Sequence, residues 1–199
     1  MKSKLILSMM AVAMISFAPG GYKTGDDVKD FSLKNVDGKM VSMSNYKDAK
    51  GFILVFTCNH CPFAKAYEAR IMALDKKYAS KGYPVIAINP NDPGAAPEDS
   101  YDNMIARAKE KNYTFPYVYD ETQDVAKAFG AARTPHVFVV KKENGKNVVK
   151  YIGAIDNNSE EPEKATQHFV EDAVDALLAG KPVPNTETKA IGCTIKWRS

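Results

Sequence analysis

The sequence lacks internal repeats, low-complexity tracts and any excess of charge of one sign. Its formal net charge is +3, but Lys2 and Lys4 lie in an N-terminal segment that we expect to be removed. Without them, 25 basic residues face 24 acidic ones, a net charge of +1. So small a charge gives no electrostatic reason to expect nucleic acid as a partner. The length of 199 residues and the 45% hydrophobic content indicate one globular domain.

The N-terminal segment lacks the length to cross a membrane. Its apolar run, residues 5–18, would span about 21 Å as a helix, whereas a bilayer core is about 30 Å thick. Two lysines precede this run and small residues follow it, as in a secretory signal peptide. We therefore predict a signal peptide over residues 1–20, with an uncleaved anchor as the alternative. It holds no cysteine for lipid attachment. The mature protein is expected to be periplasmic or secreted, without stable membrane insertion, where disulfides can persist.

After this segment, strand patterns alternate with helix patterns. Two continuous apolar runs, residues 51–56 and 84–88, are typical of strands buried on both faces. Hairpins are predicted over 30–46 and 136–153, and helices from 62 to about 82, from about 100, from 120 to 130 behind an Asp120/Gln123 capping box, and from Ser159 to Gly180. This order predicts an α/β fold with a central mixed sheet, helices on both faces and an N-terminal β-hairpin extension.

The tail, residues 181–199, is polar until the stretch AIGCTIKW. Because apolar residues return there, we expect Ile195 and Trp197 to dock onto the domain. Cys193 is the odd cysteine of three. It is either a third redox residue or a small buried hydrophobic side chain, and the sequence leaves the two interpretations even.

The other two cysteines lie in the stretch FTCNHCPF, where the first buried strand meets the first helix. Unpaired N–H groups at a helix start favour a thiolate over a thiol, and Pro62 fits a position that needs no N–H. We therefore predict that Cys58 is the more exposed and more acidic sulfur, with Cys61 deeper. A cationic His60 between them would further stabilise the Cys58 thiolate.

Two other interpretations of the cysteine pair stay open. A structural disulfide across so short a loop would add little stability, because it removes little entropy from the unfolded chain. A zinc or Cu(I) site would need further ligands, for which His136, His60 and Cys193 are the candidates. Redox exchange is the interpretation that the position at a helix start favours.

The same residues carry a resemblance. Cys58-Asn59-His60-Cys61-Pro62 after an apolar strand, with Thr134-Pro135 before the strand pattern HVFVV, resembles the thioredoxin fold over roughly residues 27–180. More narrowly, the chain is similar to the peroxiredoxin-like group of the redoxin (AhpC/TSA) superfamily that carries a C-x-x-C motif. The resemblance implies a thioredoxin-like three-layer domain over residues 21–180, with a cis proline at 135 facing the disulfide.

The resemblance also implies roles for these residues. Cys58 would be the attacking thiol and Cys61 the resolving thiol, assisted by His60, while Pro135 shapes the cleft for a partner. Thr134, Asn59 and Pro62 are the expected substrate-binding residues. A histidine before the second cysteine also occurs in protein disulfide isomerases and periplasmic disulfide oxidases.

The sequence departs from these families at several positions. Thioredoxins have tryptophan where Thr57 stands, and they bury an aspartate on the preceding strand, whereas GFILVF has no acid. The peroxiredoxin pattern P-x-x-x-T-x-x-C fits neither cysteine. Arg133 does precede the proline loop, as the peroxidatic arginine of peroxiredoxins does, so a thiol-dependent peroxidase stays an alternative. Copper-delivering Sco proteins share the fold, but three residues separate their two cysteines, whereas two separate Cys58 and Cys61.

The sequence thus predicts an exported thiol–disulfide oxidoreductase. A Cys58/Cys61 couple would exchange disulfides with protein thiols and with a redox partner protein, and no cofactor is required. The alternatives are copper or zinc delivery, with Cys58, Cys61 and His136 as ligands, and peroxide reduction helped by Arg133.

Overall fold

The computed structural model describes residues 20–199. The predicted signal peptide, residues 1–20, therefore lies outside the described residues except for its last position. Among the described helices, none has both the length and the apolar character needed to cross a membrane.

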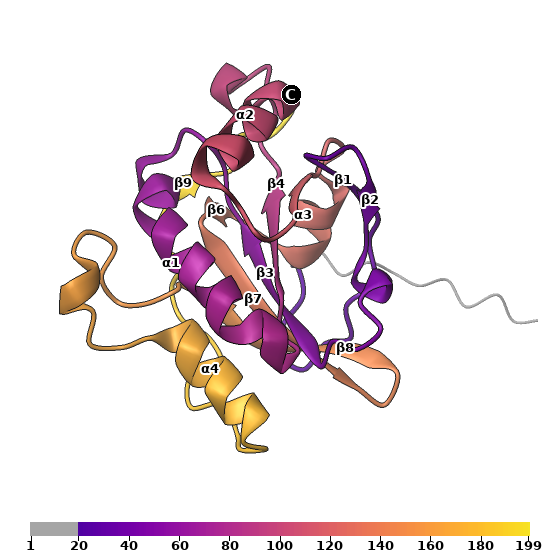
Figure 1. The fold of residues 1–199 in the computed structure, drawn as a ribbon, viewed down its shortest axis with the longest axis vertical. Coiled ribbons are helices and arrows are strands. Elements are labelled where there is room, and N and C mark those ends of the chain that lie inside the picture. Colours follow the sequence, from indigo (N-terminus) through magenta and orange to yellow (C-terminus); the bar gives the residue numbers. More distant parts are fainter. Residues whose placement is uncertain (1–19) are drawn as a thin grey trace, which may run out of the picture.

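A seven-stranded mixed sheet forms the centre of the domain (Figure 1), with the strand order β2-β1-β5-β4-β3-β7-β8. The three inner strands β3, β4 and β5 are parallel, while β7 runs antiparallel to β3 and β1 runs antiparallel to β5. The strands are β1 (Leu33–Asn35), β2 (Met40–Val41), β3 (Gly51–Phe56), β4 (Val85–Asn89), β5 (Tyr117–Tyr119), β7 (His136–Glu143) and β8 (Lys146–Gly153). The predicted α/β architecture and both hairpins are confirmed.

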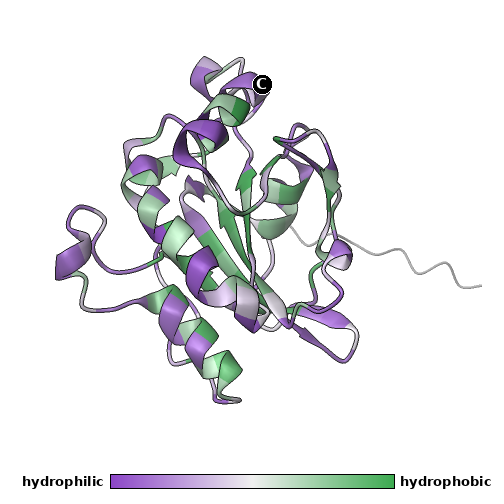
Figure 2. Ribbon diagram, in the orientation of Figure 1, coloured by the Kyte–Doolittle hydropathy of each residue, from purple (hydrophilic) through white to green (hydrophobic). Residues whose placement is uncertain are grey.

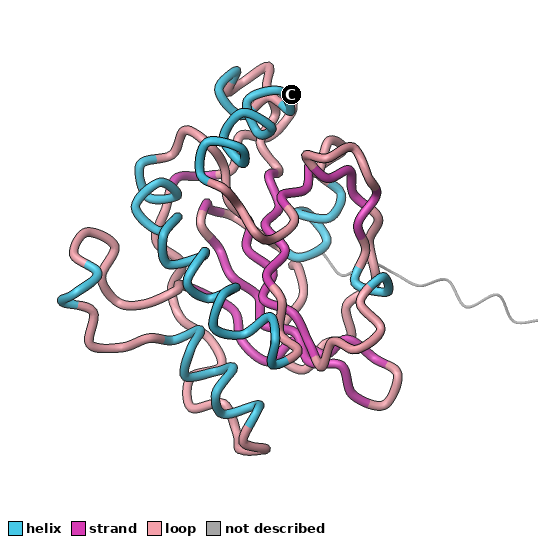
Figure 3. Tube along the Cα trace, in the orientation of Figure 1, coloured by secondary structure: helices cyan, strands magenta, loops and turns pink. Residues whose placement is uncertain are grey.

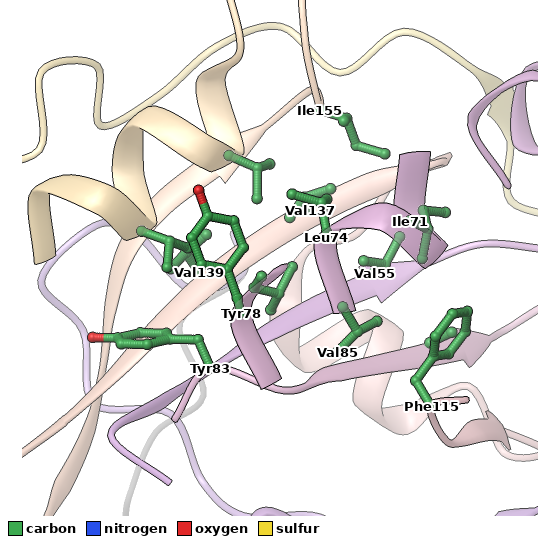
Figure 4. Packing of buried hydrophobic residues seen from close by; sticks show 14 of the residues in the cluster. Val55, Ile71, Leu74, Tyr78, Tyr83, Val85, Phe115, Val137, Val139 and Ile155 are labelled. Atoms are coloured by element: carbon green, nitrogen blue, oxygen red, sulfur yellow. The ribbon is translucent and has the colours of Figure 1, made fainter. Parts of the chain in front are cut away.

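Helices cover both faces of this sheet. They are α1 (Pro62–Tyr78), α2 (Tyr101–Lys111), α3 (Asp124–Phe129) and α4 (Phe169–Leu178). One hydrophobic cluster takes its residues from α1, α2 and α4, and Figure 4 shows part of it, with Tyr78 of α1 near Val139 of β7. A second cluster, on the other face, joins α3 to the segment before β3. The three layers follow from these two apolar cores.

Strand β3 belongs to both cores because its side chains alternate between the faces. Ile53 and Val55 lie in the first cluster, and Phe52, Leu54 and Phe56 lie in the second. All six residues of the strand are buried, and each large apolar side chain that is fully buried contributes about 1.5–3 kcal/mol to stability. In Figure 2 the hydrophobic colour is concentrated in the central strands. The strand is thus a rigid base for the residues that follow it.

Helix α4 begins ten residues later than the sequence predicts. Residues 154–168 form a loop that leads into the helix, with a short 3₁₀ turn at Pro162–Lys164 (Figure 3). Arg70 donates from Nη1 to the carbonyl of Asn158 at 2.5 Å and from Nη2 to the carbonyl of Ser159 at 3.0 Å. The Asn157 carboxamide accepts the N–H groups of Thr166 and Gln167. These bonds hold Ser159 in a loop, and its predicted role as the helix start is wrong.

The predicted capping box at α3 is only half present. The Asp120 carboxylate accepts the N–H of Ala126 at 2.7 Å and caps the helix. Gln123 has a left-handed backbone (φ 64°), and its Nε2 donates to the carbonyl of Pro90 at 2.6 Å and to that of Lys196 at 2.9 Å. The Gln123 side chain therefore ties α3 to the tail instead of capping the helix.

The tail returns to the sheet beside the start of α1 (Figure 1). Its strand β9 (Cys193–Thr194) pairs antiparallel with β6 (Arg133–Thr134), and Thr134 lies opposite Cys193. Ile195 is 3% exposed and joins the second cluster, while Trp197 is 41% exposed. The tail is thus attached through Ile195 more than through the tryptophan.

Candidate active site

The corner, residues 57–62, carries Cys58 and Cys61 from the end of β3 into α1. Cys61 occupies the position that caps α1, directly before Pro62. Cys58 is 7% exposed and Cys61 is fully buried, so the predicted order of exposure is confirmed. Both sulfurs join Ala64 in a small buried cluster, against which Phe63 and Cys193 pack.

The bonded cysteines are Cys61 and Cys193, which are 132 residues apart in the chain, with a Cα–Cα distance of 6.2 Å. Cys58 is a free thiol. The disulfide in this structure is therefore not the Cys58–Cys61 bond that the predicted couple would form when oxidised. The physical reason is the pairing of β9 with β6, which brings Cys193 against the start of α1. Cys193 is therefore not the unpaired buried side chain of the second interpretation, and its role as a third redox residue stays a prediction.

Thr134 and Pro135 lie at the centre of this arrangement. The Thr134–Pro135 peptide bond is cis, as the resemblance implies. Thr134 is fully buried; its hydroxyl lies 3.3 Å from Cys58 Sγ, and its carbonyl oxygen lies 3.3 Å from Cys61 Sγ. All three cysteines thus meet at Thr134, since Cys193 is its strand partner.

The corner is held from the other side by Asp99, a fully buried residue that follows β4. Its Oδ1 accepts the N–H of Asn59 at 2.7 Å and the N–H of His60 at 3.1 Å. Its Oδ2 lies 2.5 Å from Nδ1 of His60 and accepts a hydrogen bond from Asn91 Nδ2 at 2.7 Å. The carboxylate therefore fixes both the backbone of the corner and the ring of His60.

Sequence reasoning missed Asp99. The available signal was an acid in the loop after β4, because β4 is parallel to β3 and the two strands end at the same edge of the sheet. Asp99 supplies a buried carboxylate beside the cysteines although β3 itself has no acid. A second acid, Glu68, lines with Cys58 a cavity of about 10 Å³, and Arg107 and Tyr113 hold it there.

Burial and the Asp99 carboxylate raise the pKa of the Cys58 thiol to about 11. The Thr134 hydroxyl and the backbone N–H groups of Cys61 and His60 lower it, as expected of a helix start, but by less. The prediction of an acidic Cys58 is therefore wrong for the form in which Cys61 is bonded to Cys193. The thiol is too deeply buried for the helix terminus to decide its charge.

The expected substrate-binding residues differ in their accessibility. Pro62 is exposed at the start of α1. Asn59 is 7% exposed, donates to the carbonyl of Glu98 at 3.0 Å and accepts from the Tyr117 hydroxyl at 2.9 Å. Its side chain thus braces the corner in this structure. Thr134 pairs its backbone with β9, so this edge of the site is covered by the tail.

Arg133 and His136 flank the proline but do not join the thiols. Arg133 donates to the carbonyl of Gly192 at 2.9 Å and so holds the tail. His136 lies opposite Phe56 in the sheet, and its ring is 4.8 Å from that of Phe138. Burial, with a further contribution from Arg133, lowers the pKa of His136 to about 4.

The metal interpretation finds a different set of residues from the one predicted. Among the described residues, Cys58 groups with His60 and Asp99, whose possible ligand atoms lie within 4.8 Å of one another. Yet both oxygens of Asp99 are already engaged with N–H donors or the His60 ring. This group is therefore better described as a hydrogen-bonded cluster that positions His60 than as a metal site.

Comparison with known proteins places these features in a family context. The AhpC/TSA family model matches residues 24–152. The chain is 23% identical over 133 residues to the thiol-disulfide oxidoreductase ResA of Halalkalibacterium halodurans, covering 67% of this chain and 70% of the relative.

Two solved structures extend the comparison. An uncharacterized conserved protein from Geobacillus kaustophilus is 39% identical, with a TM-score of 0.80, over 96% of this chain and 98% of that one. The exposed lipoprotein thioredoxin of Streptococcus pneumoniae is 20% identical, with a TM-score of 0.55, over 76% of this chain and 99% of that one. The latter likeness shows the thioredoxin-like fold.

Proposed function

The chain belongs to the AhpC/TSA family, and we propose that it is an exported thiol–disulfide oxidoreductase that uses Cys58 and Cys61 to exchange disulfides with partner proteins. The observation that carries the proposal is the buried cluster of the two corner cysteines at the start of α1, beside a cis proline. The relative named ResA, from Halalkalibacterium halodurans, supports the same chemistry. Export rests on the predicted signal peptide, residues 1–20.

The reaction begins at Cys58, because it is the more exposed of the two corner sulfurs. Its thiolate attacks one sulfur of a partner's disulfide, forms a mixed disulfide and releases the partner's other sulfur as a thiolate. Cys61 then attacks the Cys58 sulfur, which releases the partner's second thiol and leaves a Cys58–Cys61 bond. The partner gains two electrons and the enzyme is oxidised. The second step requires that Cys61 be free of Cys193.

His60 and Asp99 prepare the thiol for this attack. The Asp99 carboxylate holds Nδ1 of His60, which leaves the other ring nitrogen able to take a proton. The pairing holds the His60 ring within 4.8 Å of the Cys58 sulfur, and we assign His60 as the base that accepts the Cys58 proton. Because Cys58 is otherwise held as a neutral thiol, the enzyme depends on such a base at neutral pH.

The high pKa of Cys58 also indicates a direction. An oxidising couple requires a stabilised thiolate in the reduced form, and burial works against that here. We therefore propose that the protein works as a reductant, which the reduction potential of the Cys58–Cys61 couple tests against the value of about −270 mV for thioredoxin. The partners would then be oxidised proteins, with a separate protein returning electrons.

Insulin reduction with dithiothreitol as the electron source tests the proposal. Cys58→Ser should lower the rate at least about 100-fold, because it removes the nucleophile. Cys193→Ser is the matched control, since it also removes one thiol but keeps the corner pair; it should retain disulfide reductase activity and show a two-electron couple. A Cys58→Ser protein that reduces insulin at the wild-type rate would overturn the assignment.

A further inference from the structure

The structure places a disulfide and a free thiol in one buried cluster. Cys61 is bonded to Cys193, and Cys58 lies in the same cluster against Ala64. Cys58 Sγ and Cys61 Sγ each lie 3.3 Å from an oxygen of Thr134. A thiol held beside a disulfide is the arrangement from which an intramolecular exchange can start, because attack requires only a thiolate and a sulfur within reach.

Cys193 is brought to this cluster by a strand pairing that depends on a glycine. Gly192 lies so close to β6 that a Cβ there would be 2.2 Å from the Thr134 carbonyl oxygen and 3.0 Å from the Pro135 nitrogen. Arg133 also holds the Gly192 carbonyl. The tail is thus fitted to the edge beside the corner, and the Cys61–Cys193 bond is part of that fit.

Further bonds hold the tail beyond β9. The N–H of Lys196 donates to Asn91 Oδ1 at 2.9 Å, and its carbonyl accepts from the N–H of Asp92 at 2.9 Å. The Gln123 carboxamide accepts the N–H of Arg198, also at 2.9 Å. The loop that supplies Asn91 and Asp92 continues to Asp99, so one loop supports both the tail and the corner. With these bonds in place, Cys193 would stay beside the cluster when its disulfide opens.

Resting on the proposed function, we propose that Cys193 is a third redox cysteine, which exchanges with Cys58 for the bond to Cys61. The Cys58 thiolate attacks Cys61 Sγ; the Cys58–Cys61 bond forms as the Cys61–Cys193 bond breaks. Cys193 leaves as a thiolate and takes up a proton, which balances the one that Cys58 lost. The protein keeps one disulfide throughout, and no outside oxidant or reductant takes part.

This exchange would move the disulfide from Cys61–Cys193 to Cys58–Cys61, where a partner's thiol can reach the Cys58 sulfur. In the Cys61–Cys193 form, Cys61 is fully buried and cannot resolve a mixed disulfide on Cys58. In the Cys58–Cys61 form, the more exposed sulfur carries the bond, and an incoming thiol can attack it. Cys193 thus acts as an internal partner that stores the disulfide between reactions with electron donors.

The two disulfide isomers can be told apart by tryptic mapping of the full chain. Residues 51–65 form one tryptic peptide that holds Cys58 and Cys61, and residues 190–196 form another that holds Cys193. Protein oxidised to one disulfide is quenched in acid, alkylated with N-ethylmaleimide and digested. The resting isomer, which has the Cys61–Cys193 bond of the structure, gives the two peptides cross-linked, with Cys58 alkylated. The exchanged isomer gives peptide 51–65 closed on itself, with Cys193 alkylated on a separate peptide.

We expect both isomers in the wild-type protein during turnover with dithiothreitol, and only the cross-linked pair in Cys58→Ser. Gly192→Ala should raise the ratio of the exchanged to the resting isomer at least tenfold, because the added Cβ pushes β9 off β6. Thr194→Ala, an exposed neighbour in the same strand, is the matched control and should leave the ratio unchanged.

The presence of the exchanged isomer tests the proposed exchange, and the activity of Cys193→Ser tests the proposed function separately. If the wild-type protein never shows the exchanged isomer while Cys193→Ser forms the Cys58–Cys61 couple and reduces insulin, Cys193 is a structural cysteine and the inference fails alone. If Cys193→Ser forms no couple and reduces no insulin, the proposed function fails as well.

Discussion

The corner and the tail bring their cysteines to the same place, but they are held there in different ways. The corner continues directly from β3, whose residues are all buried, and its backbone is bonded to the fully buried Asp99. Apart from the Cys61–Cys193 disulfide, the tail is held by the two-residue strand β9, one buried apolar side chain and a set of polar bonds near the surface.

The corner and the tail therefore differ in the free energy that each needs to open during the reaction. Segments with few buried apolar contacts open locally at a lower free energy than core elements do. The corner should therefore open only when the whole domain unfolds, whereas the tail, once the Cys61–Cys193 bond is open, can leave β6 at a lower free energy. Trp197 is the only tryptophan and lies in the tail, so its fluorescence reports the tail while far-UV circular dichroism reports the domain.

Of all the substitutions, removal of Asp99 from the corner should have the largest effect on stability. Asp99→Ala would leave the N–H groups of Asn59 and His60 without their acceptor, together with the Asn91 amide and the His60 ring. Removing one partner of a buried charged network costs about 3–5 kcal/mol. Urea unfolding followed by circular dichroism should show this loss for the domain as a whole.

Asp99→Asn is the matched control for that change. The amide keeps an acceptor oxygen for the corner, so it should lose clearly less stability than the alanine variant. It also removes the negative charge that helps raise the pKa of Cys58, and alkylation of Cys58 should then titrate at lower pH. If alanine and asparagine unfold at the same urea concentration as the wild type, the corner does not depend on Asp99.

His136, which follows the cis proline, should make the stability of the domain depend on pH. Its pKa in the folded protein, about 4, lies below the ordinary value of 6.5, so the unfolded chain takes up the proton first. Stability is therefore lost as the pH falls from about 6.5 towards 4, by about 2–3 kcal/mol at pH 4.5. We expect the free energy of unfolding to fall throughout this pH window and to stop falling near pH 4.

His136→Phe isolates this contribution. The phenyl ring can keep the contact with Phe138 and needs no partner for Nδ1, which is buried without one in the described structure. The free energy of unfolding of the variant relative to wild type should rise by about 2–3 kcal/mol between pH 7 and pH 4.5. A difference that is the same at both pH values would show that His136 does not cause the loss.

In the tail, Gly192→Ala should have a smaller and more local effect. Its Cβ would meet the Thr134 backbone, and overpacking of this kind costs about 1–3 kcal/mol. Hydrogen exchange should speed up at the N–H of Ile195, which bonds to the carbonyl of Ala132, while the β3 amides keep their protection. Equal loss of protection in β3 would mean that tail and corner open together.

The same contrast explains how much of the molecule the sequence predicts. The apolar run of β3 and the three- and four-residue spacing of Tyr67, Ile71 and Leu74 are local signals, and both elements appear where expected. So does the placement of Cys58 and Cys61 at the strand-to-helix corner. These features depend on neighbours in the chain, which a single sequence displays.

Features that depend on contacts between residues far apart in the chain could not be predicted from the sequence. β5, β6 and β9 are three residues long or shorter, too short for a periodic pattern. The Cys193 partner follows from β9 finding β6, and the role of Asp99 follows from a loop folding back onto the corner. The acidity of Cys58 was misjudged because the helix start is visible in the sequence, whereas burial and the Asp99 charge are not.

The smallest expected effect concerns the end of the tail, where Arg198 Nε lies 3.2 Å from Asp92 Oδ1. The arginine side chain is 52% exposed, so solvent screens the pair and its contribution is at most about 1 kcal/mol. Arg198→Ala should leave domain unfolding unchanged and shift the Trp197 transition only slightly, and less so in high salt. If Arg198→Ala destabilises the tail as much as Gly192→Ala does, the tail is held mainly by the Arg198–Asp92 ion pair and not by the close packing of Gly192 on β6.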